Sequence, residues 1–364
     1  FSNIWIVALR KDLQFRRHAY FTVLIYSVSF VVTLVACFQL RSIWGLVIGR
    51  LAGALTRMIG SYIFALQRPR FGFNRSVARE LMSYGRHIIV LNIIVYLTMQ
   101  ADDIFVGRVL GKKALGFYVM AYALANLPGT IISQVVSRIT FPLFSKIRED
   151  HTQTELVFKS VVEIMALLAL PLSGALLVGA PQIIHIAYGE KWLPALPAMC
   201  VLCIFGLTRA FSTTLVSFLQ ALGLPNKLAK FSALQLLFMA FIIYPLATSF
   251  GIVGVGLCIT LANGFGLLML LFETQRVADF PIRTWFRVQR TPFIGTLVAA
   301  ATVLGFYQIL PQESLVLRLL TLGFGGGLIY ILCLTRDPTM ANYLKSVAEF
   351  VGLRIPLTRG FKKN

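Results

Sequence analysis

Residues 92–144 decide the fold, and they read NIIVYLTMQADDIFVGRVLGKKALGFYVMAYALANLPGTIISQVVSRITFPLF. Two apolar helices meet at the short turn GRVLGKKALG, residues 107–116, and each helix carries polar residues that a lipid-facing helix would lack. On a helix that advances about 100° per residue, Asn92, Tyr96 and Asp103 fall on one stripe. Polar groups that face hydrocarbon cost several kcal/mol, so this stripe should face a protein interior or a watery cavity.

A second polar stripe follows the turn. Asn126, Thr130, Ser133 and Ser137 share one helix face, with Arg138 at its edge. Two such stripes in adjacent apolar helices are typical of a transport pathway.

The same region resembles a known family. The run DDIFVGRVLGKKALGFYVMAYALANLP, residues 102–128, and the following FPLFSKI, residues 141–147, resemble the start of the second lobe in polysaccharide exporters. These exporters belong to the multidrug/oligosaccharidyl-lipid/polysaccharide (MATE-like) superfamily, and the branch indicated is the lipopolysaccharide or colanic-acid exporter type. The resemblance extends over residues 5 to 275, and beyond them only hydropathy agrees. The matching residues are Asp102, Asp103, Gly107, Gly111, Leu115, Gly116, Tyr118, Ala121, Pro128 and Pro142.

Composition independently predicts an all-α polytopic membrane protein. The chain is 57% hydrophobic with a mean hydropathy of +0.79. We expect about ten spans, since many apolar runs reach the length of about 20 residues that a bilayer-spanning helix needs. The expected spans are 19–38, 43–66, 88–106, 114–143, 160–187, 194–222, 231–250, 252–272, 291–310 and 315–334.

The net charge of +20 reflects topology rather than a nucleic-acid partner. With both ends of the chain placed in the cytoplasm, most of the 34 Lys and Arg residues fall on the cytoplasmic side of the expected spans. Such a bias is the positive-inside rule. We therefore expect a multi-pass protein of the bacterial inner membrane, with both visible ends cytoplasmic.

Four arginines lie more than one helical turn inside the expected spans, where an ionised side chain is costly unless it is paired or hydrated. They are Arg50, Arg57, Arg138 and Arg209. Arg209 lies near the middle of its span, on one stripe with Thr213 and Gln220. Near Arg50, Gly49 and Gly53 form a G-x-x-x-G edge suited to close helix packing.

The resemblance and the spans together predict a two-lobe exporter with an incomplete first lobe. Ser42–Val47 echoes Gly251–Gly256 at an offset of 209 residues, each in the outer turn of a hairpin. Because repeated lobes are a common transporter plan, we expect the chain to lack about four N-terminal helices of a protein of about fourteen. The expected parts are 1–66, the end of the first lobe; 67–87, a cytoplasmic connector; 88–276, the second lobe; 277–335, two additional helices; and 336–364, a cytoplasmic tail.

The resemblance implies a flippase that exports an oligosaccharide linked to polyprenyl pyrophosphate, for surface polysaccharide or lipopolysaccharide biosynthesis. Arginine suits a pyrophosphate, and hydroxyls and amides suit sugars, so we expect Arg50, Arg57, Asn126, Arg138, Arg209, Thr213 and Gln220 to bind substrate. Asp102 and Asp103 are candidates for ion coupling, although a structural ion pair between Asp103 and Arg108 would also fit.

Two alternative functions remain open at this point. The first is a cation-coupled drug antiporter of the same superfamily, which the two aspartates would suit. The second is an integral membrane glycan polymerase or ligase, although the outer turns show no general acid–base pair. The sequence predicts no enzyme activity and no cofactor. It also predicts no metal site, because Cys200-x-x-Cys203 lacks a second ligand pair. The expected partners are the lipid-linked oligosaccharide, the bilayer and polysaccharide polymerase machinery, and no nucleic acid.

Overall fold

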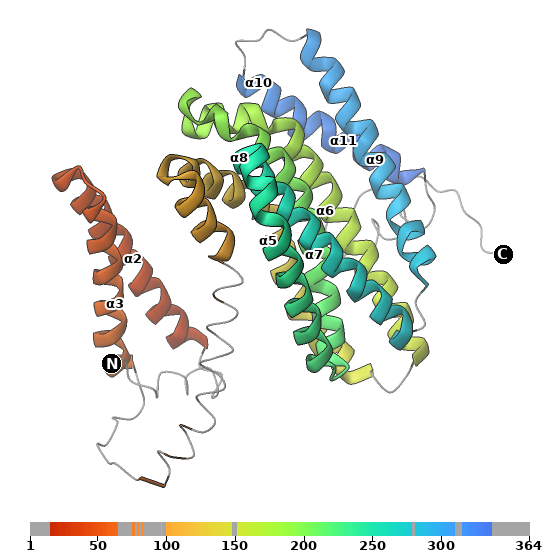
Figure 1. Cartoon of the computed structure of the whole chain (residues 1–364), viewed down its shortest axis with the longest axis horizontal. Coiled ribbons are helices and arrows are strands. Elements are labelled where there is room, and N and C mark those ends of the chain that lie inside the picture. Colours follow the sequence, from red (N-terminus) through yellow and green to blue (C-terminus); the bar gives the residue numbers. More distant parts are fainter. Residues whose placement is uncertain are drawn as a thin grey trace. The chain divides into compact units, whose positions relative to one another are not determined.

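The structure, a computed structural model, is helical throughout its regular elements in the part of the chain that it describes. The chain divides into two compact units, residues 1–92 and 93–364 (Figure 1). Eight of the described helices are long and apolar enough to cross a bilayer, so the prediction of an all-α polytopic membrane protein is confirmed. The described residues are 15–64, 100–147, 151–278, 281–309 and 315–336, with isolated residues between 75 and 96.

The first unit contains a hairpin of two helices, α2 (Phe15–Leu40) and α3 (Trp44–Phe64). They match the first two expected spans to within a few residues. The turn between them is tight, and Arg41 adopts a φ of 44° in it. This left-handed conformation is uncommon for a residue other than glycine, and it reverses the chain within a few residues.

A stripe of glycines joins the two helices of this hairpin. Gly45, Gly49 and Gly53 recur at every fourth position of α3, and all three are buried. A Cβ atom at Gly49 would lie 1.7 Å from Thr33 Oγ1, so a side chain at this position would force the helices apart. Ser29 donates a hydrogen bond of 2.9 Å to the carbonyl oxygen of Gly49. The predicted close packing through the G-x-x-x-G edge is therefore confirmed.

The second unit begins, in its described part, with the end of the helix predicted at 88–106, which continues through the π-helix η2 (Val106–Leu110). The turn expected over residues 107–116 is shorter than predicted. It is confined to Gly111, at a φ of 90°, and the next helix starts at Lys112. The elements that follow are α5 (Lys112–Ile147), α6 (His151–Tyr188), η3 (Glu190–Ala195), α7 (Leu196–Ala221) and α8 (Pro225–Ala278).

The long element α8 is itself a hairpin of two helices. Gly251, with φ 58° and ψ −136°, reverses the chain within it. The two halves are joined by the stacked rings of Phe238 and Phe265, whose centroids lie 5.0 Å apart. Lys227 and Glu273 form an ion pair near the open end of the hairpin. The predicted spans 231–250 and 252–272 are therefore the two halves of α8.

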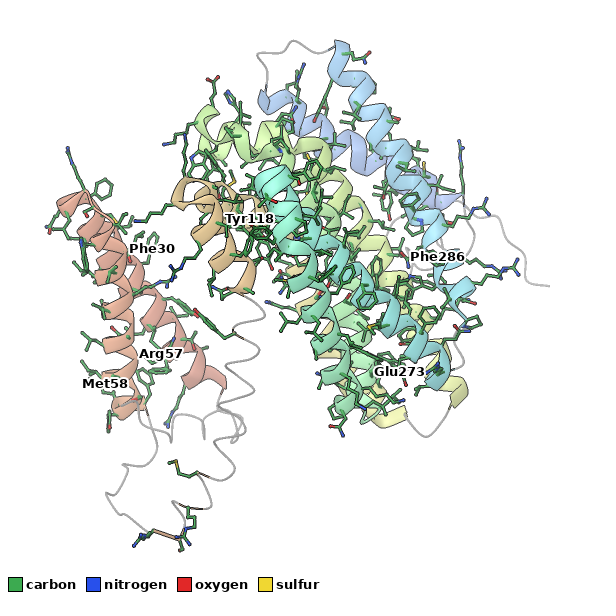
Figure 2. The ribbon with its side chains drawn as sticks, in the orientation of Figure 1. Phe30, Arg57, Met58, Tyr118, Glu273 and Phe286 are labelled. Atoms are coloured by element: carbon green, nitrogen blue, oxygen red, sulfur yellow. The ribbon has the colours of Figure 1, made fainter. Side chains whose placement is uncertain are left out.

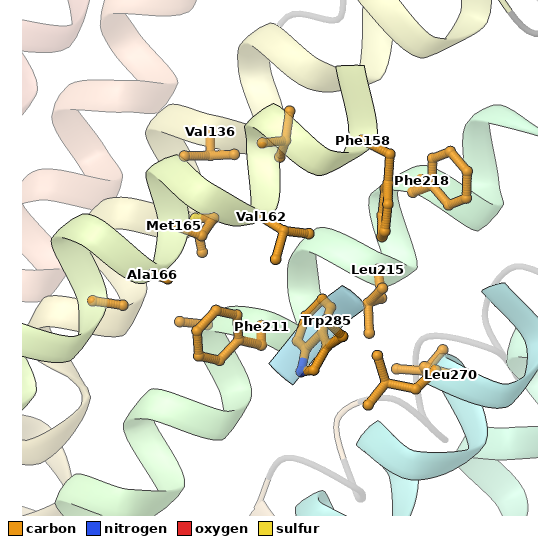
Figure 3. Packing of buried hydrophobic residues seen from close by; sticks show 14 of the residues in the cluster. Val136, Phe158, Val162, Met165, Ala166, Phe211, Leu215, Phe218, Leu270 and Trp285 are labelled. Atoms are coloured by element: carbon orange, nitrogen blue, oxygen red, sulfur yellow. The ribbon is translucent and has the colours of Figure 1, made fainter. Parts of the chain in front are cut away.

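A hydrophobic core holds α5, α6 and α7 together and includes side chains from α8 and from Trp285 (Figure 3). The ring centroids of Phe158 and Phe218 lie 4.5 Å apart, and those of Phe211 and Trp285 lie 5.3 Å apart. Aromatic pairs at these distances add to the stabilisation from buried area.

The backbones of α5 and α7 approach closely at two glycines. A Cβ at Gly206 would lie 2.5 Å from the carbonyl oxygen of Ala125, and one at Gly129 would lie 2.5 Å from the carbonyl oxygen of Gly206. Small residues at helix interfaces allow such an approach in membrane proteins. This contact fixes how the side chains of α5 and α7 face each other.

The last helices of the described chain pack against α6. Tyr330 donates a hydrogen bond of 2.9 Å to the carbonyl oxygen of Leu167. The connector predicted at 67–87 and the tail predicted at 336–364 lie almost entirely outside the described residues. The elements of this part are α9 (Ile282–Ile309), α10 (Leu315–Leu320), η4 (Thr321–Gly326) and α11 (Gly327–Thr335).

Candidate functional site

A cavity of about 600 Å³ lies between α5, α7 and α8 in the second unit. Its walls combine apolar side chains with one arginine, one aspartate and a group of hydroxyl and amide side chains. These polar lining residues are Asp102, Tyr122, Arg209, Ser212, Thr213, Ser217, Gln220, Ser232, Gln235 and Asn263. The cavity wall is therefore partly polar, although it lies among helices that are long and apolar enough to span a membrane.

Arg209 projects from the middle of α7 and provides the positive charge of the cavity wall. Its Nη1 donates a hydrogen bond of 3.1 Å to the hydroxyl of Tyr122 on α5. The Tyr122 ring packs against Tyr118 and Phe205, with centroid distances of 6.1 and 5.7 Å. These aromatic contacts fix the tyrosine, which in turn positions the guanidinium.

Asp102 provides a negative charge in the same cavity. It is 6% exposed, and its Oδ2 accepts a hydrogen bond of 2.7 Å from the hydroxyl of Tyr118, which Figure 2 labels on α5. The carboxylate also attracts Arg209 electrostatically. Two tyrosines on successive turns of α5 therefore contact the two charged groups. Tyr118 contacts the aspartate, and Tyr122 contacts the arginine.

Asp103, which shares a sequence stripe with Tyr96, is half-buried and is not among the cavity-lining residues. Among the described side chains, no ion pair joins Asp103 to Arg108. The structure thus places Asp102, rather than its neighbour, in the same cavity wall as the arginine.

Two further polar contacts join the helices around the cavity. Thr213 Oγ1 on α7 lies 2.7 Å from Ser133 Oγ on α5, which connects the second predicted stripe to the predicted Arg209 stripe. Asn263 Nδ2 on α8 donates a hydrogen bond of 2.9 Å to Thr208 Oγ1 on α7. Each of the two neighbouring helices is therefore tied to α7 by a side-chain hydrogen bond.

The remaining predicted residues lie in different places. Gln220 lines the cavity, as Thr213 and Arg209 do. Asn126 is 5% exposed and does not line it, because the close approach of α5 and α7 buries this face of α5. The side chain of Arg138 lies outside the described residues.

Arg50 and Arg57 belong to the first unit, where they line a separate groove of about 590 Å³ on the α2–α3 hairpin. Both arginines are exposed within that unit. Figure 2 labels Arg57 on α3.

Sequence reasoning did not single out Tyr122 or Gln235 as site residues. A signal for the first was present, because Tyr118, Tyr122 and Asn126 recur at every fourth position and so share one helix face. Gln235 is an amide within the mostly apolar expected span 231–250, and this could have marked it as a candidate.

The chemistry of the cavity suits binding of an anionic, hydroxyl-rich ligand. The Arg209 guanidinium offers donors in a planar fork that matches phosphate oxygens. The hydroxyls and amides offer both donors and acceptors. Among the cavity-lining residues Asp102 is the only carboxylate, so they contain no pair of carboxylates for acid–base chemistry.

Several known proteins are similar to this chain. Teichuronic acid biosynthesis protein TuaB of Bacillus subtilis is 29% identical over 219 residues, which cover 59% of this chain and 45% of that protein. Lipopolysaccharide biosynthesis protein WzxC of Escherichia coli is 24% identical over 58% of this chain and 44% of its own length. The probable low-salt glycan biosynthesis flippase Agl15 of Haloferax volcanii is 22% identical over 79% of this chain and 60% of its own length.

The fold is also similar to that of a solved transporter. The structure of the lipid II flippase MurJ in an inward closed conformation matches with a TM-score of 0.65 and 17% identity, over 86% of this chain and 66% of that one. The chain spans about half the length of the curated relatives that it matches. A family described as polysaccharide biosynthesis protein matches residues 1–197, more than half of the 364 residues. The chain therefore belongs to the polysaccharide biosynthesis protein family, as the resemblance of residues 102–128 predicted.

Proposed function

We propose that this protein takes part in flipping a lipid-linked oligosaccharide across the membrane for surface polysaccharide biosynthesis. The observation that carries the proposal is the polar cavity between α5, α7 and α8, with Arg209 in its wall. The names of the relatives support it, because they include a succinoglycan biosynthesis transport protein and a glycan flippase.

Each part of such a substrate has a chemical counterpart in the cavity. The pyrophosphate is anionic, and Arg209 donates hydrogen bonds in a geometry that suits it. Thr213, Gln220 and Asn263 offer hydroxyl and amide groups to sugar hydroxyls. The polyprenyl chain stays in the hydrocarbon region, where its transfer to water would be costly.

Asp102 is the residue that we propose for ion coupling, with Asp103 beside it. The carboxylate is buried and attracts the same arginine that would bind the phosphate groups. An anionic ligand and the Asp102 carboxylate therefore compete for Arg209. Taking up a proton or a cation at Asp102 would remove this competition, which couples the ion to the ligand.

A polysaccharide export assay tests the proposal. We expect Arg209→Ala to abolish surface glycan at matched protein level, and Arg209→Lys to restore only part of it, because an ammonium cannot reproduce a planar fork. Arg276→Ala is the matched control, since Arg276 is exposed near the end of α8 and does not line the cavity. Normal surface glycan in the Arg209→Ala strain would contradict the assignment of the cavity.

The two alternative functions gain no support from the comparisons. The named relatives are polysaccharide biosynthesis and flippase proteins, not drug antiporters. The cavity lining also lacks the paired acid and base that a glycan polymerase or ligase would need. We further propose a bacterial inner-membrane location with both visible ends in the cytoplasm, and polysaccharide polymerase machinery as a partner.

A further inference from the structure

The cavity between α5, α7 and α8 has a charged part and a neutral end. Its two charged side chains, Asp102 and Arg209, each contact a tyrosine of α5. Because an α-helix rises 1.5 Å per residue, Gln220 on α7 lies about 16 Å beyond Arg209 along the helix axis. The polar lining residues of this neutral end carry only hydroxyl and amide groups, and they are Ser217, Gln220, Ser232 and Gln235.

Three of these side chains are available to a ligand. Gln220 and Ser232 are exposed, and Gln235 is half-buried. Among the residues that the structure describes, none forms a hydrogen bond with any of the three side chains. Thr213 and Asn263 differ, because they already bond to side chains of neighbouring helices. The neutral end thus presents two amides and one hydroxyl to the cavity.

Gly266 makes room for the Gln235 amide. The two residues face each other across the α8 hairpin, where a Cβ at position 266 would lie 2.7 Å from Gln235 Oε1 and 3.1 Å from its Cδ. Nearby, the stacked rings of Phe238 and Phe265 hold the two halves of the hairpin together. The atoms in the way belong to the end of a flexible side chain, so alanine at position 266 would displace the amide without separating the helices.

The neutral end offers no counter-charge to an acidic sugar. Among the cavity-lining residues Arg209 is the only basic one, and it lies at the level that would take the pyrophosphate. A carboxylate that leaves water without a partner is costly. Amides and hydroxyls both donate and accept hydrogen bonds, which matches the hydroxyl groups of uncharged sugars.

We propose that the neutral end of the cavity is a sugar subsite that selects uncharged sugars, with Gln235 as its specificity-determining residue and Gly266 as the residue that positions it. This inference rests on the proposed function, which supplies a lipid-linked oligosaccharide as the ligand. It narrows the ligand to one whose sugars next to the pyrophosphate are neutral hexoses or N-acetylhexosamines rather than uronic acids. Gln220 and Ser232 complete the subsite from α7 and from the first half of α8.

Two matched probes that differ by one carboxylate test the selectivity. The purified full chain is placed in phosphatidylcholine nanodiscs, and microscale thermophoresis measures its affinity for geranylgeranyl pyrophosphate linked to glucose or to glucuronic acid. The unaltered chain should bind the glucose probe about ten-fold more tightly, because the glucuronate carboxylate finds no cation in the neutral end. Gln235→Lys supplies a cation and should reverse this preference.

Variants that add no charge test the amide itself. Gln235→Leu should weaken binding of the glucose probe about five-fold and leave the affinity for sugar-free geranylgeranyl pyrophosphate unchanged, which also shows that the variant is folded. Gly266→Ala should have the same effect by displacing the amide. Gln275→Leu and Gly264→Ala are the matched controls on α8. Gln275 is exposed, a Cβ at Gly264 would meet no atom within 4 Å, and neither residue lines the cavity.

The outcomes separate this inference from the function on which it rests. If the unaltered chain binds both sugar probes equally or prefers glucuronate, the inference is overturned, while a lipid-linked ligand stands. If Gln235→Leu and Gly266→Ala bind the glucose probe as their controls do, or Gln235→Lys keeps the glucose preference, Gln235 does not determine specificity and the inference is also overturned. If the unaltered chain binds none of the three probes, the ligand class is wrong and both proposals fall.

Discussion

The contact between α5 and α7 gives a prediction whose magnitude follows from the structure. Replacing Gly206 with alanine would put a Cβ atom 2.5 Å from the carbonyl oxygen of Ala125. The obstructing atom is backbone, so it cannot rotate away as a flexible side chain would. The two helices would have to separate at the point that aligns Tyr122 with Arg209.

The cost of this separation can be isolated from the effect of alanine itself. Overpacking at a tight contact costs about 1–3 kcal/mol, whereas alanine in place of glycine in a helix gains about 1 kcal/mol. Gly305 lies in α9, where an added Cβ meets no atom within 4 Å. Gly305→Ala therefore gains the higher helix propensity of alanine without a steric clash at the new Cβ atom. The free energy of unfolding should therefore be lower in Gly206→Ala than in Gly305→Ala by about 1–3 kcal/mol.

Equilibrium unfolding of both purified variants in one mixed-micelle series of increasing sodium dodecyl sulfate measures this difference. The polysaccharide export assay provides a second readout, because Gly206→Ala should also lower surface glycan at matched protein level by displacing the Tyr122 and Arg209 pair. Gly305→Ala should export as the unaltered chain does. Equal unfolding free energies for the two variants would show that the α5–α7 contact is not as close as the structure places it.

Three further predictions concern individual side chains. Tyr122→Phe removes the hydroxyl that accepts from Arg209, so glycan export should fall about ten-fold at unchanged protein level; export equal to that of the unaltered chain would mean that the hydroxyl does not position the arginine. Asp102→Asn should fold normally and abolish the dependence of export on external pH or sodium, whereas Asp103→Asn should keep it; the reverse result would assign coupling to Asp103. Lys227→Met leaves Glu273, which is 5% exposed, without its ion-pair partner and should destabilise the chain by about 1–3 kcal/mol. The double variant Lys227→Met/Glu273→Leu should recover most of this loss, and chemical denaturation of the unaltered chain and both variants measures the difference.

Hydropathy predicted the membrane helices well because it measures how apolar a segment is, and a bilayer-spanning segment must be apolar. It was less informative about where these helices extend beyond the bilayer. The span expected at 160–187 belongs to α6, which starts at His151. Its first turns, HTQTELVFKS, are too polar to count as a span but remain helical. The reversal at Gly251 was predictable, since an apolar run of this length must contain a turn to stay within the membrane.

The candidate site was predicted as a set of helix faces, and the structure shows which faces meet. A helical wheel gives the direction of a side chain relative to its own helix, but not the partner helix. It grouped Asp103 with Tyr96, whereas in the structure Asp102 accepts a hydrogen bond from Tyr118 and lines the cavity together with Arg209. Asn126 was expected in the site, yet two glycines bring α7 so close that this residue is buried outside the cavity lining.

A comparison of the two hairpins shows which residue positions helix packing restricts and which groove-facing positions can differ. Gly45 and Gly254 occur at equivalent positions because a backbone atom of the facing helix lies within 2.8 Å of where a Cβ would be. The groove-facing positions have no such restriction, and there one hairpin carries Arg50 and Arg57 while the other carries uncharged residues. Packing alone would not favour arginine at either position, because a charge in a membrane helix is costly without a counter-charge. Two arginines on one face of a hairpin without acidic residues therefore need hydration or a counter-charge from outside the hairpin.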